Sequence, residues 1–159
     1  MITIRPQRPE DKRDIAEVEA SATATLRKTY RPNQKALMHK RNITPEIQQL
    51  VAERDGHVIG VIGYYVSHDV MHILGLGVHH TYRGCGIGSS LVKSVIVTAQ
   101  DQNIPALVVQ TVEETGNVPF FEALGFQVAS RCADEYAEST DGRKLTDVCL
   151  MMEFRKDRI

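Results

Sequence analysis

Three glycines at alternate positions, Gly84, Gly86 and Gly88, follow an arginine and precede an apolar run with helical spacing. Backbone N–H groups at the start of a helix have no intrahelical partner, and the helix dipole adds positive potential there. Glycines let such a backbone approach a ligand closely because they carry no side chain. Arg83 can add a charge-assisted contact. Segment 83–89 therefore predicts a binding site for phosphate oxygens.

Two nucleotide-binding motifs use similar glycines but differ in spacing. A P-loop requires Lys and then Ser or Thr directly after its last glycine, whereas Gly88 is followed by Ser89 and Ser90. A dinucleotide-binding fingerprint requires a third glycine at a spacing that this chain lacks. The strands before the loop also have the pattern of an antiparallel meander, not of a doubly wound sheet. We therefore expect neither a P-loop nor a dinucleotide site.

The elements that position this loop follow a mixed α/β pattern. Helical spacing predicts helices after Pro9 and from Ile87, with shorter ones near 36–38 and 119–124. Apolar runs predict strands at 2–4, 47–53, 58–66, 71–78, 106–112, 126–131 and 146–154. The strand–helix–strand order over 71–112 predicts a right-handed crossover, so those two strands should lie parallel.

We therefore expect one α/β domain over residues 1–159. Its central sheet should be mixed and mostly antiparallel, with about six to seven strands, a parallel pair between strands 4 and 5, and about four flanking helices. Gly75 and Gly77 lie inside the fourth of these strands. Glycines at such positions predict a bulge or a close approach of another backbone.

Two motifs, in register with this order of elements, resemble the GNAT superfamily, the GCN5-related N-acetyltransferases. The first is the strand end L-G-V at 76–78 followed by the loop R-G-C-G-I-G at 83–88. The second is the run F-F-E-A-L-G-F at 120–126. The resemblance covers residues 2–154 and implies the acyl-CoA N-acyltransferase fold.

The resemblance implies acetyl-CoA as co-substrate. In the family, the pyrophosphate rests on the loop amides, here those of 83–89, and the pantetheine arm runs along the fourth strand at positions matching Leu76 and Val78. The residues thus implied in acetyl-CoA binding are Leu76, Gly77, Val78, Arg83, Gly84, Cys85, Gly86, Ile87, Gly88, Ser89 and Phe121.

The reaction that the resemblance implies is acetyl transfer to a primary amine of a small molecule or a peptide. The amine must lose a proton, and the thioester carbonyl must be polarised. The base position of several family members falls on His72, whose imidazole can accept a proton directly or through water. The period of two would place His72 on the face of Leu74, Leu76 and Val78. The alternative is a half-exposed strand histidine without a catalytic role.

Two positions depart from the family pattern. Phe121 stands where the family has a tyrosine acid, and it cannot donate a proton. A water, Tyr136 or no acid at all would then serve. The asparagine that many members place seven residues earlier corresponds to Glu114. The alternative function is therefore a catalytically idle acyl-CoA-binding module with a regulatory role.

Composition bears on partners and location. The net charge of -1, without a basic block, gives no reason to expect nucleic acid or an anionic membrane as partner. The three dispersed cysteines, Cys85, Cys132 and Cys149, indicate neither a disulfide framework nor a zinc motif. We expect a cytoplasmic protein that needs no metal, and the sequence leaves a homodimer open. Segments 21–42 and 133–144 should shape the acceptor pocket.

Overall fold

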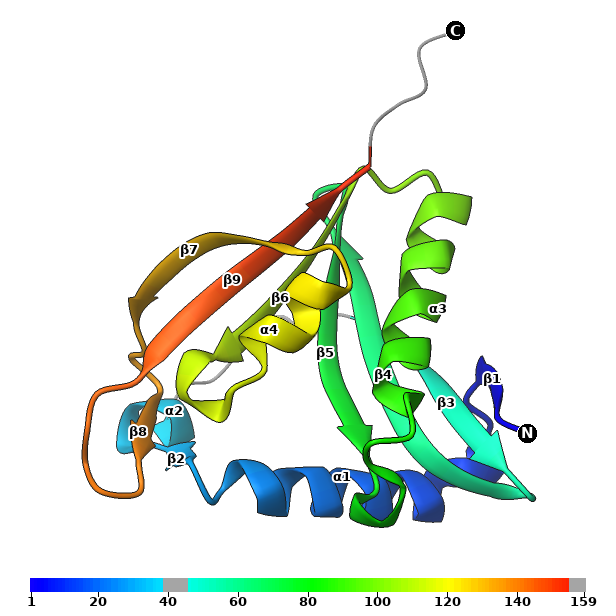
Figure 1. The fold of residues 1–159 in the computed structure, drawn as a ribbon, viewed down its shortest axis with the longest axis horizontal. Coiled ribbons are helices and arrows are strands. Elements are labelled where there is room, and N and C mark those ends of the chain that lie inside the picture. Colours follow the sequence, from blue (N-terminus) through cyan, green and yellow to red (C-terminus); the bar gives the residue numbers. More distant parts are fainter. Residues whose placement is uncertain (39–45, 155–159) are drawn as a thin grey trace, which may run out of the picture.

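A mostly antiparallel sheet organises the chain in the computed structural model, which describes residues 1–38 and 46–154 (Figure 1). The described residues form a seven-stranded sheet in the order β1-β3-β4-β5-β6-β9-β7. The strands are β1 Thr3–Pro6, β3 Gln48–Arg54, β4 His57–Ser67, β5 Val70–Val78, β6 Ala106–Val112, β7 Gln127–Ala133 and β9 Thr146–Glu153. The helices are α1 Lys12–Leu26, α2 Gln34–Met38, α3 Ile87–Asp101 and α4 Val118–Ala123.

The pairing confirms the predicted fold class. β5 and β6 are parallel, from Val70 opposite Ala106 to Ile73 opposite Val109, and α3 forms the crossover between them. The other neighbours in the sheet are antiparallel. Within the described ranges, no helix is long and apolar enough to cross a membrane.

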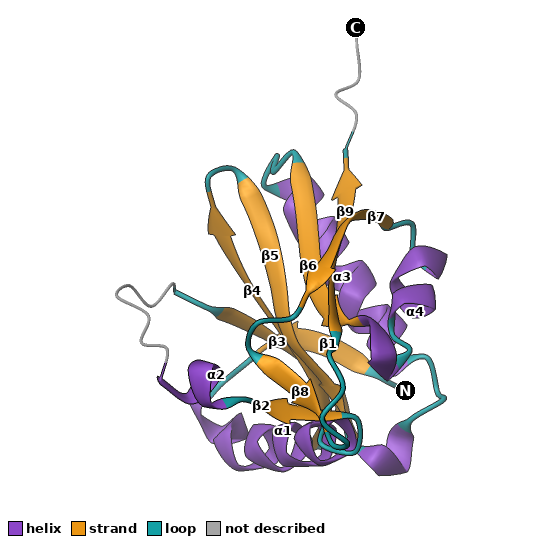
Figure 2. Cartoon of the chain, turned by 90° about the vertical axis from the view of Figure 1, so that its left-hand side faces the viewer, coloured by secondary structure: helices purple, strands orange, loops and turns teal. Residues whose placement is uncertain are grey.

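Helices cover both faces of the sheet (Figure 2). On one face, α3 and α4 pack on the main core, and α3 contributes Ile87, Leu91, Val92, Val95 and Ala99 to it. On the other face, α1 buries Ile15 and Val18 against Val51, Val58 and Val61. Both helices bury one apolar stripe, as helical spacing predicts.

A second, two-stranded sheet was not expected from the sequence. β2 (Tyr30–Pro32) pairs antiparallel with β8 (Ala137–Ser139). The sequence indicated only a helix break in the first segment and a polar stretch in the second. The Nδ2 group of Asn33 donates to the carbonyl oxygen of Glu135 at 2.7 Å and supports the pairing. Since the two strands lie about a hundred residues apart in the chain, local periodicity cannot reveal them.

β5 and β6 separate halfway along their length (Figure 1). The last parallel pair joins Ile73 and Val109, and the described residues show none beyond it. On the β4 side, the register shifts between the pairs Val61–Gly77 and Gly63–Leu74, so β5 carries an extra residue there. Gly75 has φ +64 at this bulge. Because a bulge bends its strand, β5 turns away from β6 and an opening forms between them.

Candidate functional site

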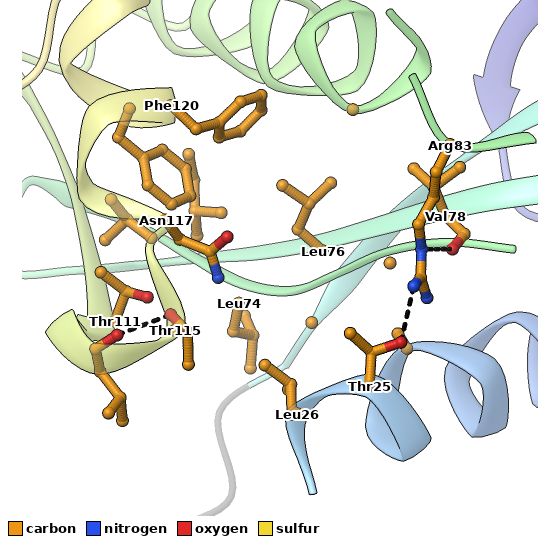
Figure 3. Close-up of a pocket in the computed structure, with 18 of the residues that line it drawn as sticks. Thr25, Leu26, Leu74, Leu76, Val78, Arg83, Thr111, Thr115, Asn117 and Phe120 are labelled. Carbon is orange, nitrogen blue, oxygen red and sulfur yellow. Dashed lines mark hydrogen bonds between the residues drawn. The ribbon is translucent and has the colours of Figure 1, made fainter. Parts of the chain in front are cut away.

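A pocket of about 840 Å³ occupies the opening between β5 and β6 (Figure 3). Its walls come from the end of α1, the second half of β5, the loop before α3, the second half of β6 and the start of α4. Most of the predicted acetyl-CoA-binding residues line it, namely Leu76, Gly77, Val78, Arg83, Gly84, Gly86, Ile87, Gly88, Ser89 and Phe121. The fold therefore brings two distant motifs, the loop and the helix of Phe121, to one cavity.

The loop meets the pocket at the first turn of α3. Gly84 and Gly86 have φ +78 and +77, in the left-handed region that favours glycine. The first α-helical hydrogen bond runs from the amide of Ser90 to the carbonyl oxygen of Gly86. The N–H groups of residues 87–89 therefore have no intrahelical partner. They lie at the pocket wall in the arrangement that binds phosphate oxygens.

Arg83 connects the loop to the neighbouring elements. Its Nη1 group donates to Oγ1 of Thr25 at 2.6 Å (Figure 3). Its Nη2 group donates to the carbonyl oxygen of Ser21 at 3.3 Å. Its Nε group donates to the carbonyl oxygen of Val78 at 3.3 Å. The guanidinium thus holds α1, β5 and the loop together, and its contact with a phosphate stays a prediction.

The glycines of β5 have separate structural roles. Gly75 adopts the positive φ of the bulge. A Cβ atom on Gly77 would lie 3.0 Å from the Cβ atom of Ala22, so α1 can pack here only against a glycine. The predicted bulge is therefore present at Gly75, and Gly77 lets the helix α1 pack closely on β5.

The bulge also changes which side chains of β5 share a face. Leu76 and Val78 pack on the core beneath α3. Ile73 also belongs to this core, so Leu74, the next residue along the strand, points to the opposite face. His72 lies two positions before Leu74, on the α1 face. The prediction that His72 shares a face with Leu76 and Val78 is therefore wrong, because the extra residue at Gly75 resets the alternation.

His72 is half-buried and does not line the pocket. Its ring stacks on that of Tyr65, with centroids 4.6 Å apart. Burial lowers the pKa of the His72 imidazole, so the ring is neutral at pH 7. The predicted role as general base stays a prediction.

Three other residues singled out in the sequence differ from one another in their position relative to the pocket. Phe121 lines the pocket but is buried, with its ring edge-on to those of Phe120 and Phe126. Cys85 is exposed beside the pocket lining, and its thiol lies 3.8 Å from the carbonyl oxygen of Arg83. Tyr136 is exposed and does not line the pocket.

Sequence reasoning missed several polar residues of the pocket. Asn117 points into it from the start of α4 (Figure 3). The carboxylate of Glu114 instead accepts a hydrogen bond from the amide of Thr146 and does not line the pocket. Asn117 precedes Phe121 by one helical turn, and that spacing could have identified it. Further polar side chains line the pocket from α1, from strands and from loops, without a local motif: Thr25, Tyr30, Gln110, Thr111, Thr115 and Asp147.

The two segments predicted to shape the acceptor pocket differ in their relation to this cavity, and their role in acceptor binding stays a prediction. Thr25, Leu26 and Tyr30 of segment 21–42 line the cavity, while residues 39–42 of that segment lie outside the described residues. Segment 133–144 contributes none of the lining residues. Across residues 1–38 and 46–154, no group of three or more His, Cys, Asp or Glu could hold a metal ion.

Comparison with other sequences yields related acetyltransferases. A Bacillus subtilis (strain 168) protein with the provisional name ribosomal protein bS18-alanine N-acetyltransferase is 27% identical over 100 residues, 63% of each chain. A mouse protein provisionally named N-acetyltransferase family 8 member 5 is 34% identical over 84 residues, 48% of this chain and 37% of that one. Neither match reaches two thirds of the relative's length.

Comparison with solved structures supports the fold. The ribosomal-protein-S18-alanine N-acetyltransferase of Escherichia coli superposes with a TM-score of 0.78, at 18% identity, over 99% of this chain and 97% of that one. A GCN5-related N-acetyltransferase of Kribbella flavida gives 0.75, at 19% identity, over 96% and 98%. At this identity the likeness shows a shared fold. The sequence model of the acetyltransferase (GNAT) family matches residues 14–126, which is more than half of the chain. The resemblance is thereby confirmed, and the chain belongs to the acetyltransferase (GNAT) family.

Proposed function

We propose that the protein transfers the acetyl group of acetyl-CoA to a primary amine of a small molecule or a peptide. The observation that carries this proposal is the pocket between β5 and β6, which joins unpaired amides at the start of α3 to an unpaired edge of β5. Membership of the acetyltransferase (GNAT) family supports the same activity.

Two features of the pocket suit the pyrophosphate and the pantetheine arm of acetyl-CoA. The pyrophosphate would accept hydrogen bonds from the N–H groups of residues 87–89. The pantetheine arm carries amides and would pair with β5 beyond Ile73, where β6 no longer does so. The Val78 carbonyl oxygen already accepts from Arg83, which leaves Leu76 as the main position for such a contact.

The chemistry requires a proton acceptor and a polarised carbonyl. A β5 amide near Leu76 would donate to the thioester oxygen as negative charge develops on it. The amine nitrogen then forms a bond to the carbonyl carbon, and the bond from carbon to sulfur breaks. His72 would take the ammonium proton through a water, because its ring does not line the pocket. The nitrogen would release its second proton to solvent as the amide forms. The departing thiolate would take a proton from solvent, since Phe121 has none to donate.

The acceptor would approach from the α1 side of the sheet. Thr25, Leu26 and Tyr30 line the pocket on that side, and the first turn of α3 lies on the other. The name of the Bacillus relative specifies an alanine of a ribosomal protein as its acceptor. That name supports including peptides among the acceptors to be tested.

A panel of amines with acetyl-CoA tests the proposal. The panel should include peptides with free amino termini, amino acid amides and polyamines, and the readout is free thiol. We expect thiol release that depends on both the protein and at least one amine. Thermal stabilisation by acetyl-CoA without thiol release for any amine would instead favour the idle acyl-CoA-binding module. Stabilisation by ATP or NAD but not by CoA would indicate another nucleotide ligand.

A further inference from the structure

One acidic residue lies in the pocket wall. Among the described residues that line the pocket, Asp147 is the single carboxylate and Arg83 the single lysine or arginine. Asp147 stands near the start of β9, opposite Val112 at the end of β6. Arg83 lies across the opening, on the loop that follows β5. The two charges therefore belong to opposite walls of the pocket.

Strand pairing places Asp147 on the face of the sheet that the acceptor would use. Its neighbours in β9, Val148 and Leu150, belong to the core beneath α3 and α4. Side chains alternate along a strand, so Asp147 points to the other face, that of α1. Gln110 of β6 pairs with Cys149 and shares this face with Asp147. Gln110 and Asp147 thus add polar side chains to the pocket wall on the acceptor side.

The carboxylate of Asp147 has no partner of opposite charge. In the part of the chain that the structure describes, its side chain makes no hydrogen bond and no ion pair, although it is partly buried. Burial, and then the negative charge of Asp134, raise the pKa of the Asp147 carboxyl above its usual value. A partly buried carboxylate without a partner is unfavourable, and a cation beside it would relieve that cost.

We propose that Asp147 determines acceptor specificity by pairing with a positively charged group of the acceptor and by disfavouring acceptors that carry a carboxylate beside their amine. This inference rests on the proposed acetyl transfer. It defines the acceptor class as a cationic amine, such as the amino terminus of a peptide or a polyamine, in place of a free amino acid. Asp147 acts here in binding, and His72 keeps its proposed role in proton transfer.

The test compares two acceptors that differ in one charge: an amino acid amide and the free amino acid, each with saturating acetyl-CoA. The wild-type protein should prefer the amide in kcat/KM. Asp147→Asn keeps the side-chain volume but removes the charge, and it should reduce this preference by about 10- to 100-fold, mainly through KM for the amide. Glu122→Gln is the matched control, because Glu122 is an exposed carboxylate of α4 outside the pocket wall. It should leave the preference unchanged.

A second variant covers the case in which Asp147→Asn fails to fold. Gln110 is exposed on the same face, so Gln110→Lys places an ammonium beside Asp147 and should also abolish the preference for the amide. An unchanged preference in either folded variant would overturn the inference while the acetyl transfer itself persists. An equal fall in kcat for both acceptors would overturn it too, because that result assigns Asp147 to catalysis or to folding. If the wild-type protein acetylates no amine at all, the proposed function fails first.

Discussion

Replacement of Gly86 by alanine tests whether the backbone before α3 binds phosphate. Gly86 has φ +77 and ψ 10, a left-handed conformation that costs an alanine about 1–2 kcal/mol. A Cβ atom there would meet no other atom within 4 Å, so sterics add nothing in the free protein. We expect the free energy of unfolding to fall by this amount, with a Tm lower by roughly 2–4 °C for each kcal/mol.

Binding should suffer beyond this loss of stability. The new methyl group would extend from the pocket wall at the position where the pyrophosphate must approach the amides. Loss of one charge-assisted hydrogen bond corresponds to about 1.5–3 kcal/mol, hence a Kd for acetyl-CoA that is roughly 10- to 100-fold higher. Isothermal titration with acetyl-CoA, at a temperature where both proteins are folded, measures this difference.

Gly142→Ala provides the matched control. Gly142 has φ +82, a Cβ atom there would also meet nothing within 4 Å, and the residue does not line the pocket. This variant should lose the same stability and bind acetyl-CoA as tightly as the wild type. If Gly86→Ala also binds acetyl-CoA normally, with the same loss of Tm as Gly142→Ala, the loop does not hold the pyrophosphate and the reasoning fails.

Three further predictions concern packing, stability and the base. Gly77→Ala should lower the free energy of unfolding measured in urea by about 1–3 kcal/mol, because its Cβ atom would lie 3.0 Å from that of Ala22. Adding Ala22→Gly to this variant should restore part of the loss. Equal urea midpoints for the wild type and Gly77→Ala would contradict this prediction. The Arg5 guanidinium lowers the pKa of Asp11 to about 2. The ion pair between the two side chains therefore stabilises the folded state above about pH 4, and this stabilisation is lost as the pH falls toward 2. Asp11→Asn should therefore lower the free energy of unfolding by about 1–2 kcal/mol at pH 7 and reduce its dependence on pH between about pH 4 and 2. If the free energy of unfolding of the variant falls with pH in parallel with that of the wild type, the assignment to Asp11 is refuted. His72→Gln should reduce kcat by about 100-fold or more and remove the loss of activity that protonation of His72 causes at acid pH. Because burial lowers the pKa of His72, the wild type should lose this activity below the usual titration range of histidine. An unchanged pH–rate profile would exclude His72 as the base.

Much of the fold follows from local sequence patterns. Apolar residues repeat with a period of two in the strands of the main sheet and with a period of 3.6 in the helices that cover it. The crossover through α3 fixes the parallel direction of β5 and β6. The loop of Gly84, Gly86 and Gly88 was identified because its spacing excludes other nucleotide motifs. These features depend on residues that are close together in the chain.

The parts of the site that sequence reasoning missed depend on non-local geometry. The pattern of β5 indicated a bulge, but its position at Gly75 decides that His72 and Leu76 lie on opposite faces. Asp147 is brought to the pocket wall by the pairing of β9 with β6, and no motif surrounds it in the sequence. Tyr30 is placed in the wall at the start of β2, whose partner β8 lies about a hundred residues away.

The measurement that tests the central claim most directly is backbone hydrogen exchange with and without acetyl-CoA. Acetyl-CoA should slow exchange in the loop and first turn at 83–89 and in β5 at 76–78, where the pyrophosphate and the pantetheine arm would bind. Amides of β3 and of the far half of α3, which lie away from the pocket, should keep their exchange rates. Protection that spares both 83–89 and 76–78, or no protection at saturating acetyl-CoA, would contradict the assignment of this pocket as the acetyl-CoA site.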